Sequence, residues 1–217
     1  MAKPRIGIIG KGNVGTALSE GLGAKGYDVD TVGNEPERVR DVAKKSDVVI
    51  LAVPYDEREN ALNELGDAVD GKVLVDVTNA FRSGESGMEF AHGLDASGAE
   101  ELQRKAPRAT VVKAFNTTFA AAMSSGHSHD AQLSVLVAGD DAKAKETVLG
   151  MARQIGFDAV DAGPLKNALW LETLGFLNIE LGYGQGMGPL GVRLVRANEA
   201  ERLRSEGSAG ESTAEAT

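Results

Sequence analysis

Short apolar runs alternate with segments of helical spacing along most of the chain. The apolar runs predict strands, which fall at residues 5–10, 27–33, 47–54, 71–80, 109–116, 131–140 and 157–163. The segments between them predict helices, which fall at residues 14–26, 35–46, 55–69, 97–107 and 141–156. Strands that alternate with helices, most of them apolar on both faces, are typical of a doubly wound, mostly parallel α/β sheet. We therefore expect a Rossmann-type domain over residues 1–163.

The pattern changes after this domain. Residues 165–184 form a long apolar stretch that predicts a helix with no strand behind it. One face of this helix is apolar, which favours packing against the core or against a second copy of the chain over the alternative, a cofactor pocket. Its residues are Trp170, Leu174, Leu177 and Leu181. Residues 197–217 are rich in Ser, Gly, Ala and Glu and predict a disordered tail, which leaves 164–196 as a small C-terminal helical extension.

Composition narrows the class of protein. The formal net charge of −9 argues against general nucleic-acid binding, which requires a basic surface. No apolar run reaches the roughly 18 residues that span a bilayer, and the N-terminal apolar stretch is too short for a signal peptide. We therefore expect a soluble, cytoplasmic protein without membrane contact. The absence of cysteine excludes disulfides, thiol catalysis and cysteine-bound metals.

The histidines do not predict a metal site. His127 and His129 stand one residue apart, a spacing that does not suit a tetrahedral site shared with Asp130. A solvated loop is the favoured interpretation of this segment. His92 lies in a glycine-rich stretch and is expected to be a loop residue rather than a base.

The segment 10–15, with the sequence GKGNVG, carries the clearest chemistry. Its glycines follow a predicted strand and open a predicted helix, which is the context of a dinucleotide-binding turn. Gly10 would permit the tight turn, Gly12 would let the pyrophosphate approach, and Gly15 would let helix and strand pack closely. The N-terminus of the helix would supply N–H groups to the phosphates. A glycine turn without a ligand is the alternative.

The end of the second strand bears on which dinucleotide binds. A site for NAD usually has an acidic residue there, which accepts a hydrogen bond from the ribose 2′-hydroxyl. Gly33 and Asn34 leave room for a 2′-phosphate, which Asn34, Arg38 or Lys11 could contact. Glu35 could instead repel that phosphate or accept from a free hydroxyl. NADP(H) is favoured, with NAD as the alternative, and a solvated helix face remains the alternative role of Arg38.

In an open α/β sheet, ligands bind beyond the carboxyl ends of the strands. Four such ends are expected to surround the nicotinamide, at residues 52–56, 76–81, 113–118 and 161–165. Thr78, Asn79 and Asn116 offer neutral hydrogen-bonding groups. Lys113 is the only cation among them and is either an anion or carbonyl contact or a surface lysine. Apolar walls would come from Val53, Pro54, Phe115 and Phe119.

These strand ends contain no obvious acid–base pair. A dehydrogenase that acts on an alcohol usually needs a positioned proton donor or acceptor. Hydride exchange between two cofactor rings requires chiefly stacking, orientation and exclusion of water. The sequence therefore favours a second ring cofactor as the reaction partner.

Two segments carry a resemblance to a known family. The segments IGIIGKGNVGTALSEGL and DAGPLKNALWLETLGFLNIELGYGQGMGPLGVRLV resemble the coenzyme F420-dependent NADP reductases. Similar proteins have a Rossmann domain and a small C-terminal helical part that closes over the site, and they form dimers. The stretch KAFN, at residues 113–116, is more similar to the NADPH-binding domain of membrane ferric reductases, in which flavin is the acceptor. The chain has Asn34 and Glu35 where the F420-dependent family usually has Ser and Arg.

The resemblance implies roles for individual residues. The pyrophosphate would be held by Gly10, Lys11, Gly12, Asn13, Val14 and Gly15. The adenosine ribose would lie at Gly33, Asn34 and Arg38, and the nicotinamide at Ala52, Val53, Pro54, Thr78 and Asn79. The acceptor would be bordered by Lys113, Asn116, Thr117, Gly186, Met187 and Gly188.

We therefore expect an NADP(H)-dependent oxidoreductase that exchanges hydride with a second ring cofactor. Coenzyme F420 is the first choice of acceptor and flavin the second, in a homodimer with small-molecule ligands only. A reductase of ferric ion or of a small carbonyl or imine is an alternative in the same class. A non-catalytic module that senses NADP(H) is the alternative from another class.

Overall fold

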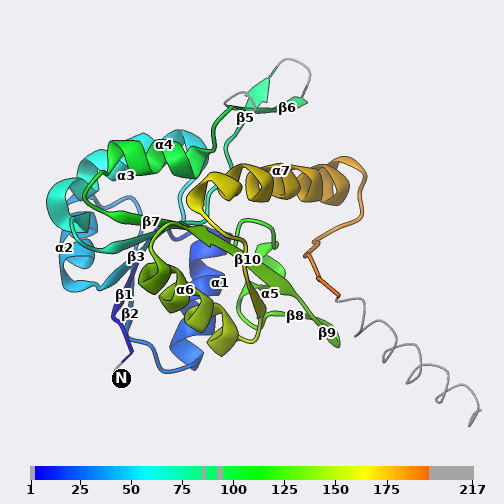
Figure 1. Cartoon of the computed structure of the whole chain (residues 1–217), viewed down its shortest axis with the longest axis horizontal. Helices are drawn as coiled ribbons and strands as arrows, with labels where there is room; N and C mark the ends of the chain where they lie inside the picture. Colours follow the sequence, from blue (N-terminus) through cyan, green and yellow to red (C-terminus); the bar gives the residue numbers. More distant parts are fainter. Residues whose placement is uncertain (1–2, 85–86, 92–94, 196–217) are drawn as a thin grey trace, which may run out of the picture.

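The computed structural model describes residues 3–84, 87–91 and 95–195 (Figure 1). The expected tail at 197–217 and His92 lie outside these ranges.

A seven-stranded sheet forms the centre of the fold, in the order β2-β1-β3-β4-β7-β10-β11. The strands are β1 (Ile6–Ile9), β2 (Val29–Val32), β3 (Val48–Leu51), β4 (Val73–Asp76), β7 (Thr110–Lys113), β10 (Ser134–Gly139) and β11 (Asp158–Asp161). All neighbours are parallel except β7 and β10, which pair antiparallel with Ala138 opposite Lys113. This confirms the expected Rossmann-type, mostly parallel sheet.

Helices cover both faces of the sheet (Figure 1). One face packs against α1 (Asn13–Ala24), α5 (Ala120–Met123) and α6 (Ala142–Ile155). The other packs against α2 (Pro36–Lys45), α3 (Arg58–Leu65) and α4 (Gly98–Lys105). Two buried apolar clusters therefore lie on opposite sides of the strands, as their apolar residues on both faces require.

Local chemistry explains where several helices begin and end. Pro36 occupies the first turn of α2, where its missing N–H is not needed. Ser97 caps α4 by accepting from the Glu100 N–H, while the Glu100 carboxylate accepts from the Ser97 N–H. Asp141 caps α6 by accepting from the Ala144 N–H, and Gly26, at a φ of 76°, follows the end of α1.

Two short hairpins interrupt the alternation and were not expected from the pattern. Strands β5 (Phe81–Gly84) and β6 (Gly87–Phe90) form one that extends from the body of the fold above α7 (Figure 1). Strands β8 (His127–Ser128) and β9 (Ala131–Gln132) form the other. The expected solvated loop at His127 and His129 is thus partly a hairpin, with both histidines exposed.

The C-terminal helix forms as a succession of three helical types. A 3-10 turn, η3 (Leu165–Asn167), leads into α7 (Ala168–Ile179), which continues as a π-helical segment, η4 (Glu180–Gly184). Trp170 and Leu177 of α7 are 66% and 52% exposed. These two side chains therefore do not pack in the core of this chain, whereas Leu174 and Leu181 of the same face are half-buried. Packing of this face against a second copy stays a prediction.

Candidate dinucleotide-binding site

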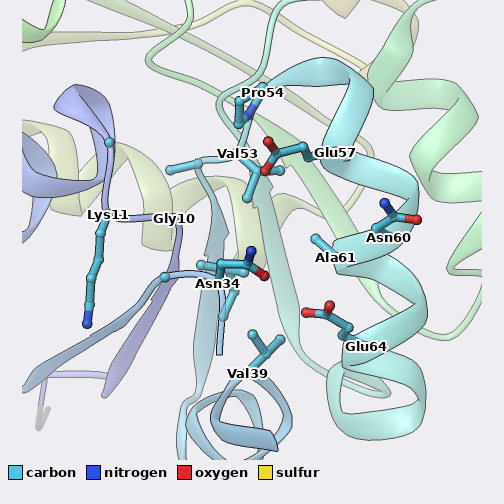
Figure 2. Close-up of a pocket in the computed structure, with 14 residues that line it drawn as sticks. Gly10, Lys11, Asn34, Val39, Val53, Pro54, Glu57, Asn60, Ala61 and Glu64 are labelled. Atoms are coloured by element: carbon cyan, nitrogen blue, oxygen red, sulfur yellow. The ribbon is translucent and has the colours of Figure 1, made fainter. Parts of the chain in front are cut away.

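The fold creates a crevice beside β1. The chain passes from β1 to β2 on one side and returns to β3 on the other, so the order reverses at β1 and β3. The carboxyl ends of strands at such a reversal form the usual ligand site of open α/β sheets. A cavity of about 420 Å³ lies there (Figure 2). It is lined by Ile9, Gly10, Lys11, Gly12, Gly33, Asn34, Val39, Ala52, Val53, Pro54, Glu57, Asn60, Ala61 and Glu64.

The glycine turn between β1 and α1 has a conformation that needs its glycines. Gly10 has a φ of 120°, and an added Cβ would overlap the carbonyl of Ala52, the residue after β3. A Cβ on Gly15 would overlap the Gly10 carbonyl, so α1 can approach the turn only with glycine there. These contacts match the tight-turn and close-packing roles of such a motif.

Gly12 differs from the other two glycines, because a Cβ added there would meet no protein atom within 4 Å. It is the N-cap of α1 and has no side chain that could accept from the N–H groups of the first turn. The helix begins at Asn13 and includes Val14. Open space beside uncapped helix N–H groups is the arrangement that a pyrophosphate requires, so the turn fits a dinucleotide.

Charged side chains gather at the end of β2. The Glu35 carboxylate accepts hydrogen bonds from Lys11 Nζ at 3.2 Å and from Arg38 Nη1 at 3.0 Å. These hydrogen bonds, from Arg38 first and Lys11 second, lower the pKa of Glu35. Arg38 also lies 3.5 Å from Asp30, and the Lys11 side chain passes over Gly33. The two cations that could bind a 2′-phosphate are therefore already paired with the carboxylate that could accept from a free 2′-hydroxyl.

One wall of the cavity was not expected from the sequence. Glu57, Asn60 and Glu64 line the cavity (Figure 2). They come from α3 and from the 3-10 turn Tyr55–Glu57 that leads into it. They stand three and four residues apart, which places them on one face of a helix. That spacing was available in the sequence, but polar residues on one helix face are most often solvated.

The polar residues at the ends of β4 and β7 bond mainly to one another. Thr78 is buried, and its N–H and Oγ1 donate to Asp76 Oδ1 at 3.0 and 2.7 Å. Lys113 is 0% exposed; its Nζ donates to the Thr78 carbonyl and lies 3.0 Å from both Asp76 and Glu172 of α7. Lys113 is thus neither a surface lysine nor a contact at the mouth of the cavity. Its three donors are used inside the protein.

Arg58 extends this buried charge cluster toward α4. Its guanidinium donates to the Gly98 carbonyl at 2.8 Å and to Glu101 at 2.5 Å, and lies 4.0 Å from Asp76. Burial by itself would raise the pKa of Asp76, but Lys113 and Arg58, with hydrogen bonds from Thr78 and Lys113, outweigh it and hold that pKa below its usual value. The carboxylate therefore stays ionised inside the protein.

Asn79 and Asn116 form a reciprocal pair. Asn79 Nδ2 donates to the Asn116 carbonyl at 3.1 Å, and Asn116 Nδ2 donates to Asn79 Oδ1 at 2.9 Å. Asn116 Nδ2 also donates to the Leu171 carbonyl of α7, while its buried Oδ1 has no hydrogen-bond partner among the described residues. Thr117 is buried beside this pair. Asn116 and Thr117, which follow β7 and were expected to border the hydride acceptor, thus lie against α7.

The glycine-rich segment after η4 lies farther along the chain. Gly186 and Gly188 have φ values of 71° and 80°, and Met187 between them is 63% exposed. The Gly188 N–H donates to the Gly182 carbonyl. Phe119 packs edge-on against Tyr183 at 5.2 Å between ring centroids. The positive φ values give these two glycines a conformational reason to be glycine.

The segment after β11 does not join the site. Because β10 is antiparallel to β7 and parallel to β11, β11 runs in the direction opposite to β1, β3, β4 and β7, and residues 161–165 do not line the cavity. Asp161 there pairs with Lys145 of α6 at 2.9 Å and accepts from the Gly163 N–H. The expectation that residues 161–165 surround the nicotinamide assumed parallel strands throughout, which the antiparallel pairing of β10 with β7 contradicts.

Known proteins that resemble this chain in sequence identify its family. The family model for coenzyme F420-dependent NADP oxidoreductases matches residues 5–45 and 32–80. The F420-dependent NADP reductase of Methanocaldococcus jannaschii is 30% identical over 177 residues, covering 80% of this chain and 78% of that one. The chain belongs to the F420-dependent NADP reductase family. It is thereby a member of a family of NADP-dependent oxidoreductases.

Two further proteins resemble this chain, one in structure and one in sequence. A crystal structure from Arthrobacter sp. FB24, described as a candidate F420-dependent NADP reductase, superimposes with a TM-score of 0.81 at 26% identity and covers 89% of this chain and 100% of that chain. The metalloreductase STEAP3 of Rattus norvegicus is 33% identical over 183 residues, covering 79% of this chain. The chain spans only 36% of that relative's length.

Two further features of the described residues bear on function. Among the helices in these ranges, none combines the length and apolar character needed to cross a membrane. In the same part of the chain, no three His, Asp or Glu side chains are grouped so that they could hold a metal ion.

Proposed function

We propose that this oxidoreductase exchanges hydride between NADP(H) and a second ring cofactor, with the deazaflavin coenzyme F420 as first choice and flavin as second. The observation that carries the proposal is the glycine turn, which is open at Gly12 and borders the cavity at the β1/β3 reversal. The similarity to F420-dependent NADP reductases over most of the chain supports the choice of acceptor.

The dinucleotide would lie along the carboxyl edge of the sheet. Residues 10–15 would hold the pyrophosphate through backbone N–H groups at the start of α1. The adenosine would occupy the cavity between Asn34 and α3, where Glu57, Asn60 and Glu64 offer acceptors to the amino group of adenine. The nicotinamide would point from Val53 and Pro54 toward the end of β4.

The acceptor would lie beyond the nicotinamide, near Asn116, Thr117 and the segment 186–188. When bound, the two cofactors supply the chemistry, which is transfer of a hydride from the dihydronicotinamide to the acceptor ring. The residues of the chain bind the dinucleotide, orient the rings and exclude water. A proton donor is not required at the reacting carbon, which agrees with strand ends that carry amides and hydroxyls.

The proposal is tested by mixing the purified protein with NADPH and one acceptor at a time. Absorbance at 340 nm reports loss of reduced nicotinamide. We expect oxidation with F420, or with FMN or FAD, and the variant Gly12→Val should lose it, because its side chain would fill the pyrophosphate space. Binding of NADPH without oxidation by any acceptor would refute the enzyme and favour a sensor module.

Ferric reduction is a second candidate, favoured by the 33% identity to a metalloreductase. Ferric chelates alone and ferric chelates with FAD distinguish it. Reduction of iron that requires FAD would mean that flavin, rather than F420, receives the hydride.

We also propose that two copies pair through α7. Trp170 and Leu177 are exposed on one face of this helix, and exposed large apolar side chains in a row are typical of an interface. Light scattering of the wild type and of Leu177→Glu at equal concentration tests this. A monomeric wild type would overturn the pairing.

A further inference from the structure

Helix α7 meets the sheet through an unusual set of buried residues. Glu172, Gly175 and Asn178 are all buried and stand three residues apart, so they share one face of the helix. The face of a helix that packs on a core is normally apolar, because burying polar groups is costly unless they are paired. Each of these three residues contacts one of the two strand ends that the proposed function assigns to the nicotinamide and the acceptor.

Glu172 joins α7 to β7 and to α4. Its two carboxylate oxygens accept from the N–H groups of Gly98 and Ala99 at 2.9 and 3.2 Å. One of them also lies 3.0 Å from Lys113 Nζ. Lys113 donates in turn to the Thr78 carbonyl, so a single cation connects the helix to the end of β4. A displacement of Glu172 would therefore be passed to Thr78.

Gly175 lies against the reciprocal amide pair. A Cβ added there would stand 2.5 Å from Asn79 Oδ1 and 2.9 Å from Asn116 Nδ2. Only glycine lets the backbone of α7 rest on these two side chains. The close approach also brings the Leu171 carbonyl within 2.8 Å of Asn116 Nδ2.

Asn178 completes the contact one turn farther along. Its Nδ2 donates to the Thr117 carbonyl at 2.8 Å, and both residues are buried. The backbone that follows β7 is thus held by α7 directly after the amide pair. The Glu172, Gly175 and Asn178 contacts together reach Asn79, which follows β4, and residues 113–117 at and after the end of β7.

We propose that Glu172, Gly175 and Asn178, together with Lys113, form a positioning seam for the nicotinamide end of the site. They are positioning residues, because they act through Thr78, Asn79, Asn116 and Thr117 rather than through contact with the ligand. None of them lines the cavity at the adenosine end. The seam therefore controls how the reacting end of the dinucleotide is placed, while the glycine turn controls whether the dinucleotide binds. This inference rests on the proposed function for the location of the nicotinamide.

The test compares Gly175→Ala with Gly150→Ala. Gly150 lies inside α6 and has no atom within 4 Å of an added Cβ, so it is a matched control for the same change in a helix. The new methyl group at residue 175 must move the amide pair by about 1 Å, and a displacement of that size can lower a rate about 100-fold. Glu172→Gln is a second variant, which removes the charge beside Lys113, keeps one acceptor oxygen for α4 and replaces the other oxygen with an N–H donor.

Two measurements separate positioning from a merely structural role. The first is the dissociation constant of NADPH beside that of 2′-phospho-ADP-ribose, which lacks the nicotinamide; NADH and ADP-ribose serve if the site prefers them. The second is the deuterium isotope effect on kcat with NADPH labelled at nicotinamide C4. For Gly175→Ala we expect weaker NADPH binding, 2′-phospho-ADP-ribose binding within about twofold of the wild type, and a 10- to 100-fold lower kcat with a larger isotope effect. Gly150→Ala should match the wild type in all of these.

Other outcomes would overturn the positioning seam, the proposed enzyme, or both. Equal weakening of both ligands, or a lower melting temperature with unchanged binding and isotope effect, would overturn the seam. A wild type that binds NADPH but oxidises it with no acceptor would refute the proposed enzyme alone, because the comparison of the two ligands still reports on the seam. A wild type that binds neither dinucleotide would overturn both proposals.

Discussion

Replacing Lys113 with methionine tests the buried charge cluster most directly. Methionine has a similar length and flexibility but no charge, so Lys113→Met removes the cation from between Asp76 and Glu172 while preserving most of the packing. Removing one partner of a buried ion pair typically destabilises a protein by about 3–5 kcal/mol, because an uncompensated charge is left inside.

The contacts that remain place the expected loss of stability near the lower limit of this range. Asp76 keeps Arg58 at 4.0 Å and the two donors of Thr78, and Glu172 keeps two N–H donors from α4. We therefore expect a loss of about 3 kcal/mol at pH 7. With a urea dependence of about 2–3 kcal/mol/M, the midpoint of unfolding would fall by roughly 1–1.5 M.

The dependence on pH makes this prediction specific. In the wild type, the lowered pKa of Asp76 contributes stability that is present above its unfolded value of about 3.9 and is lost as the pH falls through the folded value. Without Lys113, the effect of burial on Asp76 is opposed only by Arg58 and Thr78, so the pKa of Asp76 rises and protonation relieves the unpaired charge. The stability difference between variant and wild type should therefore shrink as the pH falls from 8 to 5.

The assay is urea unfolding followed by far-ultraviolet circular dichroism at several pH values. Lys105→Met is the control, since Lys105 pairs with Glu59 and Glu101 at the surface, where such pairs contribute about 0–1 kcal/mol. A loss below about 1 kcal/mol for Lys113→Met, or a loss that is constant across pH, would show that the cluster does not hold a buried charge as described.

Three further changes test the site and its supports. Glu35→Gln should raise the affinity for NADPH relative to NADH a few-fold, because it releases two cations for the 2′-phosphate. The control Glu37→Gln, at an exposed residue, should leave the ratio of the two dissociation constants unchanged. An unchanged ratio for both variants would place the ribose elsewhere. Gly12→Val should abolish dinucleotide binding in calorimetry without lowering the melting temperature, and Gly23→Ala, in equally open space, should bind normally. Ser97→Ala should cost about 1 kcal/mol in thermal unfolding by removing the cap of α4, and full stability would contradict that role.

The sequence predicted the central sheet well because its signals are local. Strands such as β1 and β3 are buried on every residue, so their apolar runs identify them without knowledge of their partners. The glycine turn was equally readable, since the special φ at Gly10 and the close approach at Gly15 depend on neighbouring segments. Eight of the expected dinucleotide residues line one cavity, because the carboxyl ends of the parallel strands β1, β2 and β3 meet at the same end of the sheet. They are Gly10, Lys11, Gly12, Gly33, Asn34, Ala52, Val53 and Pro54.

What the sequence did not predict depends on contacts between distant segments. The direction of β10 is set by its pairing with β7, and an apolar run reads the same in either direction. The β5–β6 hairpin is held by Phe81 and Phe90, whose rings pack against Phe176 of α7 at 5.0 and 4.9 Å. Nothing near Phe81 in the sequence indicates that partner.

Polar residues at the ends of β4 and β7 show why strand-end chemistry is ambiguous. Thr78 and Asn116 have the residue types of ligand contacts, yet their hydrogen bonds go to other residues of the protein. Thr78 donates to Asp76, and Asn116 donates to Asn79 and to the Leu171 carbonyl of α7. The same groups can orient a ligand or anchor a covering helix. That they anchor α7 becomes visible only from the structure, in which Gly175 lies against Asn116 and Glu172 lies beside Lys113. A helix that covers the reacting end of a site must attach there through groups that stay paired when buried. This requirement explains why α7 departs from an apolar pattern at Glu172, Gly175 and Asn178, on the face that attaches to the strand ends.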